Sequence, residues 1–101
     1  MLIVAVEVIV DTGAIDELRN ALRTMEEATR KESGCLTYAF SVDVNDPTML
    51  RVFERWETME ALNAHFKTPH MAAFNTAIGK IQPKSIDIKV YEIAKEVPLP
   101  G

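Results

Sequence analysis

Two histidines are the side chains of this sequence best suited to proton transfer near neutral pH. His65 and His70 both fall in the segment 63–71. Imidazole takes up and releases protons at working pH, so both are candidates for general acid–base chemistry. On an ideal helix a spacing of five residues turns two side chains about 140° apart. Pro69 also interrupts the segment, so we do not expect the two histidines to share a metal site.

Each histidine also has a purely structural interpretation. His65 could be a packed helix residue beside Leu62 and Phe66, with one ring nitrogen bonded to a neighbouring backbone group or carboxylate. His70, which follows Pro69 directly, could simply be exposed to solvent. Spacing alone does not decide between these interpretations and catalysis.

Glu54 is the carboxylate that the sequence places in apolar surroundings. It shares one side of an expected strand with Leu50, Val52 and Trp56. A carboxylate among such neighbours is expected to have a partner such as an arginine, a tyrosine or a histidine. We therefore take Glu54, together with His65, as the candidate catalytic residues.

Aromatic side chains near these positions indicate a mostly apolar cleft with a few polar groups, the usual makeup of a small-molecule pocket. Trp56 and Tyr38 could equally close the hydrophobic core. Cys35 shows no pattern that would stabilise a thiolate and is expected to be a small buried residue. The candidate substrate-binding residues are Tyr38, Trp56, Phe66, His70 and Phe74.

Composition narrows the class of protein. The chain has 101 residues, of which 48% are hydrophobic and 26% charged, which is typical of one small folded domain. Its net charge of -4 gives no positive electrostatic field that would attract nucleic acid or anionic membranes. The single cysteine cannot form an internal disulfide, and the apolar run 2–10 is too short to span a bilayer, so we expect a cytoplasmic protein. The four glycines lie far apart and form no phosphate-binding loop, so no cofactor is expected.

Hydrophobic periodicity predicts strand, helix, hairpin, helix and strand. Strands are expected at 2–10, 35–44, 49–57 and 86–91. A helix follows Gly13 and ends near 33–34, and two shorter helical stripes meet at Thr68 and Pro69. This order predicts a single α+β domain of ferredoxin-like βαββαβ plan, with an antiparallel sheet and the helices on one face of it. The domain spans 1–101, with its core at about 2–93 and a tail at 96–101.

The first strand also predicts an assembly. Residues 2–10 are apolar at both odd and even positions, as in a strand buried on two faces, yet the helices can cover only one. A chain of this length cannot cover the second face itself. We therefore expect a homodimer built on the sheet face turned away from the helices.

Several short stretches of the sequence form one combined pattern. They are Glu32-Ser-Gly-Cys-Leu-Thr-Tyr38, Asp46-Pro47, Phe53-Glu-Arg-Trp56, Glu60-Ala-Leu62, His65-Phe66 and Pro69-His70. Taken together, these stretches closely resemble the antibiotic biosynthesis monooxygenase family, which includes proteins assigned as quinol monooxygenases. The resemblance covers residues 2 to about 93 and implies a dimeric α+β barrel with a pocket between sheet and helices in each subunit.

The resemblance implies a reaction of molecular oxygen with a small electron-rich aromatic, a quinol or phenol, without metal or flavin. In such chemistry the substrate anion supplies the electron, and His65, which matches the family's helix histidine, would be the general base.

Relatives with other activities leave alternatives open. Haem-degrading relatives use an Asn on the first strand, which this chain lacks, and Asn75 stands at the position nearest their haem-binding histidine. Haem cleavage is therefore disfavoured. An isomerase of a phosphorylated quorum-sensing signal has a segment similar to 65–70. A non-catalytic dimeric module that binds small molecules in a stress response is the remaining alternative.

Overall fold

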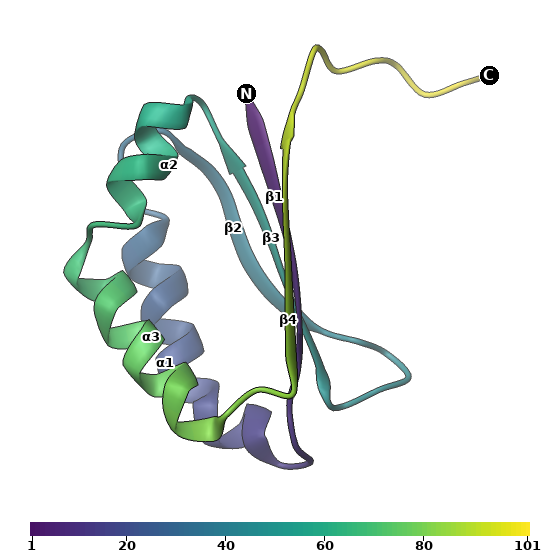
Figure 1. The fold of residues 1–101 in the computed structure, drawn as a ribbon. Coiled ribbons are helices and arrows are strands. Elements are labelled where there is room, and N and C mark those ends of the chain that lie inside the picture. The colour runs from purple at the N-terminus through teal and green to yellow at the C-terminus, as the bar shows by residue number, and fades with distance from the viewer.

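The structure, a computed structural model, describes residues 1–101 and has the predicted ferredoxin-like α+β plan. Four antiparallel strands form one sheet in the order β2-β3-β1-β4, and all three helices lie on one side of it (Figure 1). In chain order the elements are β1 (Leu2–Ile9), α1 (Ala14–Thr29), β2 (Cys35–Val42), β3 (Met49–Trp56), α2 (Met59–His65), α3 (Pro69–Ile81) and β4 (Ser85–Glu92). None of the helices combines the length and the apolar composition needed to cross a membrane.

Helix α1 is amphipathic as predicted, and it ends earlier than predicted. Ile15, Leu18, Leu22 and Met25 form its buried stripe against the sheet. The helix ends at Thr29 rather than near 33–34 because the chain continues as a hydrogen-bonded turn. This turn carries the segment 30–34 back toward β2 and places it against α2.

The alternation predicted for β2 holds in the middle of the strand and fails at both ends. Tyr38 is buried on the helix side. Cys35 pairs with Trp56 and Thr37 pairs with the adjacent Arg55, so Leu36 is the extra residue of a β-bulge. The side chain of Leu36 is exposed. Val44 lies in the hairpin turn and is 97% exposed, so it belongs to no apolar face.

Strand β3 carries the predicted core face. Leu50, Val52, Glu54 and Trp56 are all buried, which confirms that these four side chains share the helix side of the sheet. Period-two alternation could identify this face because β3 is paired on both edges without a bulge in its own chain. A carboxylate is thereby built into the core.

A short turn at residues 66–68 separates α2 from α3. Thr58 caps α2 by accepting a hydrogen bond from the Ala61 amide, and Thr68 caps α3 by accepting one from the Met71 amide. Pro69 is the first residue of α3, where it fits without losing a helical hydrogen bond. The chain therefore changes direction between His65 and Pro69.

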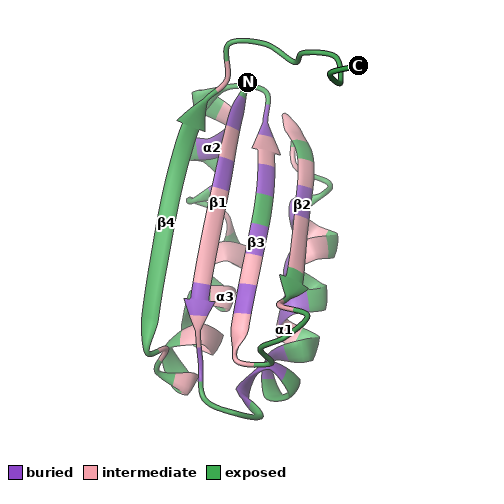
Figure 2. Ribbon diagram, turned by 90° about the vertical axis from the view of Figure 1, so that its right-hand side faces the viewer, coloured by how far each residue is buried: buried purple, intermediate pink, exposed green.

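The helices leave β4 uncovered on both sides of the sheet, and Figure 2 shows the whole strand as exposed. Ile86 and Ile88 pair with Val8 and Val6, so they face the helix side, yet they are 51% and 59% exposed. We expected a bare surface only on the far face. The structure adds an open apolar stripe on the near face, at the edge of the core.

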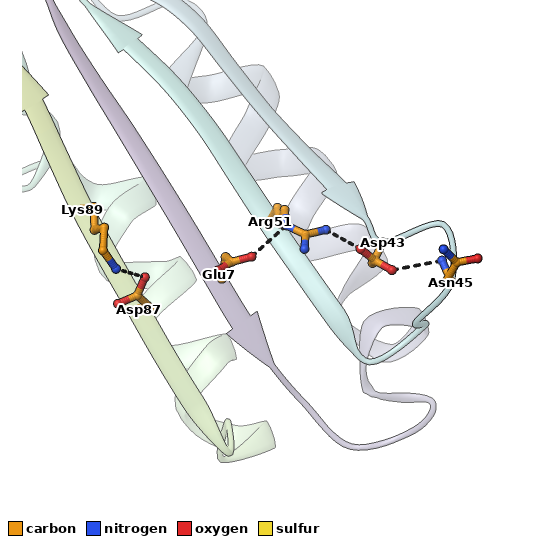
Figure 3. A network of polar contacts seen from close by, with 6 residues as sticks. All are labelled: Glu7, Asp43, Asn45, Arg51, Asp87 and Lys89. Carbon is orange, nitrogen blue, oxygen red and sulfur yellow. Dashed lines mark hydrogen bonds and ion pairs between the residues drawn. The ribbon is translucent and has the colours of Figure 1, made fainter. Parts of the chain in front are cut away.

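The far face of the sheet is partly polar. Arg51 donates to Glu7 and to Asp43, and Lys89 bonds Asp87 on β4 (Figure 3). Nearer the start of β1, Ile3 and Ala5 lie on the same face, and Ala5 is paired with Phe53, which is 45% exposed. The far face is therefore mixed, because Arg55 pairs with Ile3 and Lys89 with Ala5 among the apolar side chains.

Gly34 is the residue on which the contact between the turn and α2 depends. Its φ is +82°, and an added Cβ would lie 2.6 Å from Cβ of Ala61. We expect Gly34→Ala to lower the free energy of unfolding by about 2 to 4 kcal/mol, from left-handed strain plus the clash. Chemical denaturation measures this loss.

A matched control separates strain from clash. Gly13 has a similar φ of +87° with nothing near its added Cβ, so Gly13→Ala should cost only about 1 to 2 kcal/mol. Adding Ala61→Gly to Gly34→Ala should recover the difference. Equal losses for the two single variants would contradict the close contact between the turn and α2.

Candidate functional site

One carboxylate oxygen joins the two histidines. Oε2 of Glu32 lies 2.7 Å from Nδ1 of His65 and 2.7 Å from Nε2 of His70. The three residues come from the turn after α1, the last position of α2 and the first turn of α3. An ionised carboxylate only accepts hydrogen bonds, so each of these ring nitrogens carries a hydrogen. In neutral His65, Nε2 is then left without a proton.

The ring of His65 is held in place by other aromatic rings. Its centroid lies 4.9 Å from that of Trp56, 5.6 Å from Tyr38 and 5.5 Å from Phe66. Its side chain is only 2% exposed. The packing and the bond to Glu32 together fix both the orientation and the tautomer of the ring.

A cavity of about 130 Å³ lies between the sheet and the helices α2 and α3. Thirteen of its sixteen lining residues are hydrophobic, and its polar lining includes Glu54, His65 and Asn75. Glu32 does not line this cavity, whereas His65 does. Glu32 occupies Nδ1 of His65, so Nε2 is the ring nitrogen left for a bound molecule.

Glu54 is held in the cavity wall by its neighbour on the same strand. Nε1 of Trp56 donates to Oε1 of Glu54 at 2.9 Å. Burial raises the pKa of Glu54, while the bond from Trp56 and the nearby His65 oppose the rise and the charge of Glu32 adds to it. We expected an arginine, tyrosine or histidine as its partner, and the partner is instead the tryptophan two residues further along β3.

Two other acidic groups near the site stay protonated. Burial, followed by the charge of Glu54, raises the pKa of Tyr38 well above its ordinary value, so its hydroxyl is a hydrogen-bond donor in the cavity wall. Burial, followed by the charges of Glu32 and Glu54, raises the pKa of Cys35. A reactive thiolate at Cys35 is thereby disfavoured, in line with its expected structural role.

The cavity brings together five of the predicted site residues. Tyr38, Glu54, His65, Phe66 and Phe74 line it. Two other predicted substrate-binding residues do not. Trp56 is fully buried behind Glu54, and His70 points to Glu32 from outside the cavity. Trp56 can influence a bound molecule through Glu54 and His65, and His70 can do so through Glu32 and His65.

Glu32 is the functional candidate that we did not predict. It lies 33 residues before His65 in the chain, and no local spacing connects the two. The ideal-helix argument that separated His65 from His70 does not apply, because the residues belong to two helices of different direction and meet at one oxygen. A signal was present only in the stretch 32–38 that carries the family resemblance.

The sequence pattern of the family described as "Antibiotic biosynthesis monooxygenase" matches residues 1–77, which is more than half of the chain. The chain belongs to this family. A solved structure described as a "putative antibiotic biosynthesis monooxygenase" from Deinococcus radiodurans superposes with a TM-score of 0.91 at 26% identity, covering 100% of both chains.

Two sequence relatives are similar over shorter stretches. The chain is 34% identical over 73 residues to protein sll1783 of Synechocystis sp., covering 72% of this chain and 50% of that one. It is 38% identical over 56 residues to the Escherichia coli protein named "Probable quinol monooxygenase YgiN", covering 48% and 54%. The chain thus spans about half the length of these two relatives.

The buried Glu54 should make stability depend on pH. Its pKa is raised in the folded protein above the ordinary value of 4.5, so as pH rises the unfolded chain loses this proton first. Stability should therefore fall from about pH 4.5 up to the raised folded value. Glu54→Gln removes this fall and still accepts from Trp56, so its stability relative to the native protein should rise between pH 4.5 and the raised folded pKa and stay level below pH 4.5. Thermal unfolding across this range measures the difference.

Glu57→Gln is the matched control, because Glu57 is exposed at the end of the same strand. It should leave the pH profile of the native protein unchanged. A native profile that is flat above pH 4.5, or one that Glu54→Gln fails to alter, would contradict the assigned environment of Glu54.

Proposed function

We propose that the protein is a monooxygenase that oxidises a small electron-rich aromatic, a quinol or a phenol, with molecular oxygen and without metal or flavin. The observation that carries the proposal is the contact of 2.7 Å between Nδ1 of His65 and Oε2 of Glu32 beside an apolar cavity that His65 lines, since this contact leaves Nε2 of the neutral ring to accept a proton. Membership of the monooxygenase family supports the reaction class.

The lining of the cavity favours a phenol over the alternative ligands. A phosphorylated signal molecule needs cationic groups, and no lysine or arginine lines the cavity. Flat apolar molecules suit a lining that includes the rings of Tyr38, Phe40 and Phe74. A hydroxyl on such a molecule would find the acceptor it needs at Nε2 of His65.

The reaction balances without an external reductant. His65 takes the phenolic proton, and the resulting anion gives electrons to oxygen. One oxygen atom enters a ring carbon that bears hydrogen, opposite or next to the hydroxyl, and the other leaves as water, so that a phenol and O₂ become a quinone and water, and a quinol and O₂ become a hydroxyquinone and water. The apolar cavity keeps bulk water away from the anion, and the protonated Tyr38 supplies a hydrogen-bond donor.

Replacing the base should abolish most of the activity. With a panel of hydroquinones, naphthols and flavonoids, we expect oxygen uptake by the native protein with at least one compound. His65→Ala should lower the rate by roughly 100- to 10,000-fold, the usual contribution of a placed base. An oxygen electrode measures the rate, and circular dichroism checks that the variant is folded.

Tyr38→Phe serves as the comparison variant, since it keeps the ring in the cavity wall and removes only the donor. It should cost less than His65→Ala. Quenching of Trp56 fluorescence without oxygen uptake would instead indicate a binding module. Full activity in folded His65→Ala would show that the histidine is only a packing residue.

We further propose that the protein is a homodimer whose subunits meet at the far face of the sheet. The apolar side chains Ile3, Ala5 and Phe53 on that face support a second copy as the cover, because a chain of 11.3 kDa cannot cover them alone. Glu7 and Arg51 on the same face already compensate each other's charge, so burying this pair adds no unpaired ion.

Sedimentation at micromolar concentration should give about twice the chain mass of 11.3 kDa. Phe53→Glu places a charge beside the apolar side chains Ile3 and Ala5 and should produce monomers. Val44→Glu, at an exposed position in the hairpin turn, should not. A native protein that sediments as a soluble monomer would rule the dimer out.

A further inference from the structure

The cluster of Glu32, His65 and His70 has the composition of a metal site as well as that of a catalytic base. Its three donor atoms lie within 4.8 Å of one another. The only ion-pair partners of Glu32 are the two histidines, so no lysine or arginine occupies the position of a cation. The side chains are 2%, 12% and 21% exposed for His65, Glu32 and His70, which leaves the cluster partly shielded and reachable from the His70 side.

We propose that these three residues bind one divalent transition-metal ion of the Zn²⁺ type, and that the bound ion inhibits the protein. Two imidazole nitrogens and one carboxylate oxygen are a donor set that Zn²⁺ and its first-row neighbours use with an open coordination position. Mg²⁺ and Ca²⁺ prefer oxygen donors alone and are not expected to bind.

The distances require only a small rearrangement. Donors around a tetrahedral ion with bonds of 2.0–2.1 Å lie roughly 3.3 Å apart. The two present contacts of 2.7 Å would lengthen as the hydrogens between the atoms leave, and the two nitrogens would approach each other. His65 is fixed by its ring contacts, so the more exposed His70, in the first turn of α3, is the ligand that moves.

Inhibition follows from the tautomer. In the metal-free protein the contact with Glu32 places the hydrogen of neutral His65 on Nδ1, so the free lone pair of the ring is on Nε2. A metal ion on Nδ1 needs the lone pair of that nitrogen, so the ring hydrogen moves to Nε2. His65 then has no lone pair for a substrate proton. Metal binding by itself is independent of the proposed function, whereas the inhibition rests on it.

Calorimetric titration of the tag-free, chelator-treated full chain with Zn²⁺ tests the site. We expect one Zn²⁺ per chain, and at least about tenfold weaker binding in His70→Ala and in the isosteric Glu32→Gln, since each removes one donor. Glu60→Gln, an exposed carboxylate on α2, is the matched control and should bind like the native protein. Co²⁺ should give the visible absorption of a four-coordinate ion in the native chain and lose it in His70→Ala.

Two results would overturn the site: no heat of binding with Zn²⁺ at millimolar concentration, or equal affinity in the native chain and both ligand variants. The inhibition has a separate test. Zn²⁺ should suppress oxygen uptake at the concentration at which it binds. Stoichiometric binding that leaves oxygen uptake intact would retain the metal site and refute the inhibition, and binding to a chain that oxidises no phenol would refute only the proposed function.

Discussion

The hydrogen bonds of Glu32 are the interaction on which the arrangement of the site depends. A carboxylate that is largely shielded from water is tolerated when donors satisfy it, and two imidazole N–H groups do so here. Because those donors come from α2 and α3, the turn after α1 must lie against both helices. Gly34 permits this approach, since its backbone conformation and its contact with Ala61 leave no room for a side chain.

The same arrangement separates two acids with different roles. Glu32 lies outside the cavity and binds the histidines, whereas Glu54 lies in the apolar wall and its pKa is raised by burial. Each influences the other, because the charge of Glu32 contributes to the rise at Glu54. One carboxyl outside the cavity thus positions His65, while a second carboxyl of raised pKa lies in the wall that a bound molecule would contact.

The cavity reflects how three helices cover a four-stranded sheet. Helices α1 and α3 pack over β1, β2 and β3, while β4 remains exposed (Figure 2). Ile86 and Ile88 therefore form one wall of the cavity and are at the same time open to solvent. A ligand that reached this wall would remove apolar surface from water, which is a source of affinity that needs no specific polar contact.

The elements themselves could be read from the sequence because they rest on short-range regularities. Alternation identified the core face of β3, including Glu54. The capping residues Thr58 and Thr68 marked the starts of α2 and α3. Local rules did less well where the chain is irregular. They extended α1 beyond Thr29 and did not detect the bulge at Leu36, since a turn and a bulge depend on what the neighbouring segment offers.

The sequence by itself determined the fold class, the family resemblance and the chemical types available, two histidines and a carboxylate in an apolar strand. Only the tertiary structure decided which groups meet. The bond between Glu32 and His65 spans 33 residues, and a contact closed by chain reversal leaves no periodic pattern. The choice between Phe66, which lines the cavity, and Trp56, which is buried behind it, likewise depends on how α2 packs on β3. Packing of distant segments, and not local propensity, makes those choices.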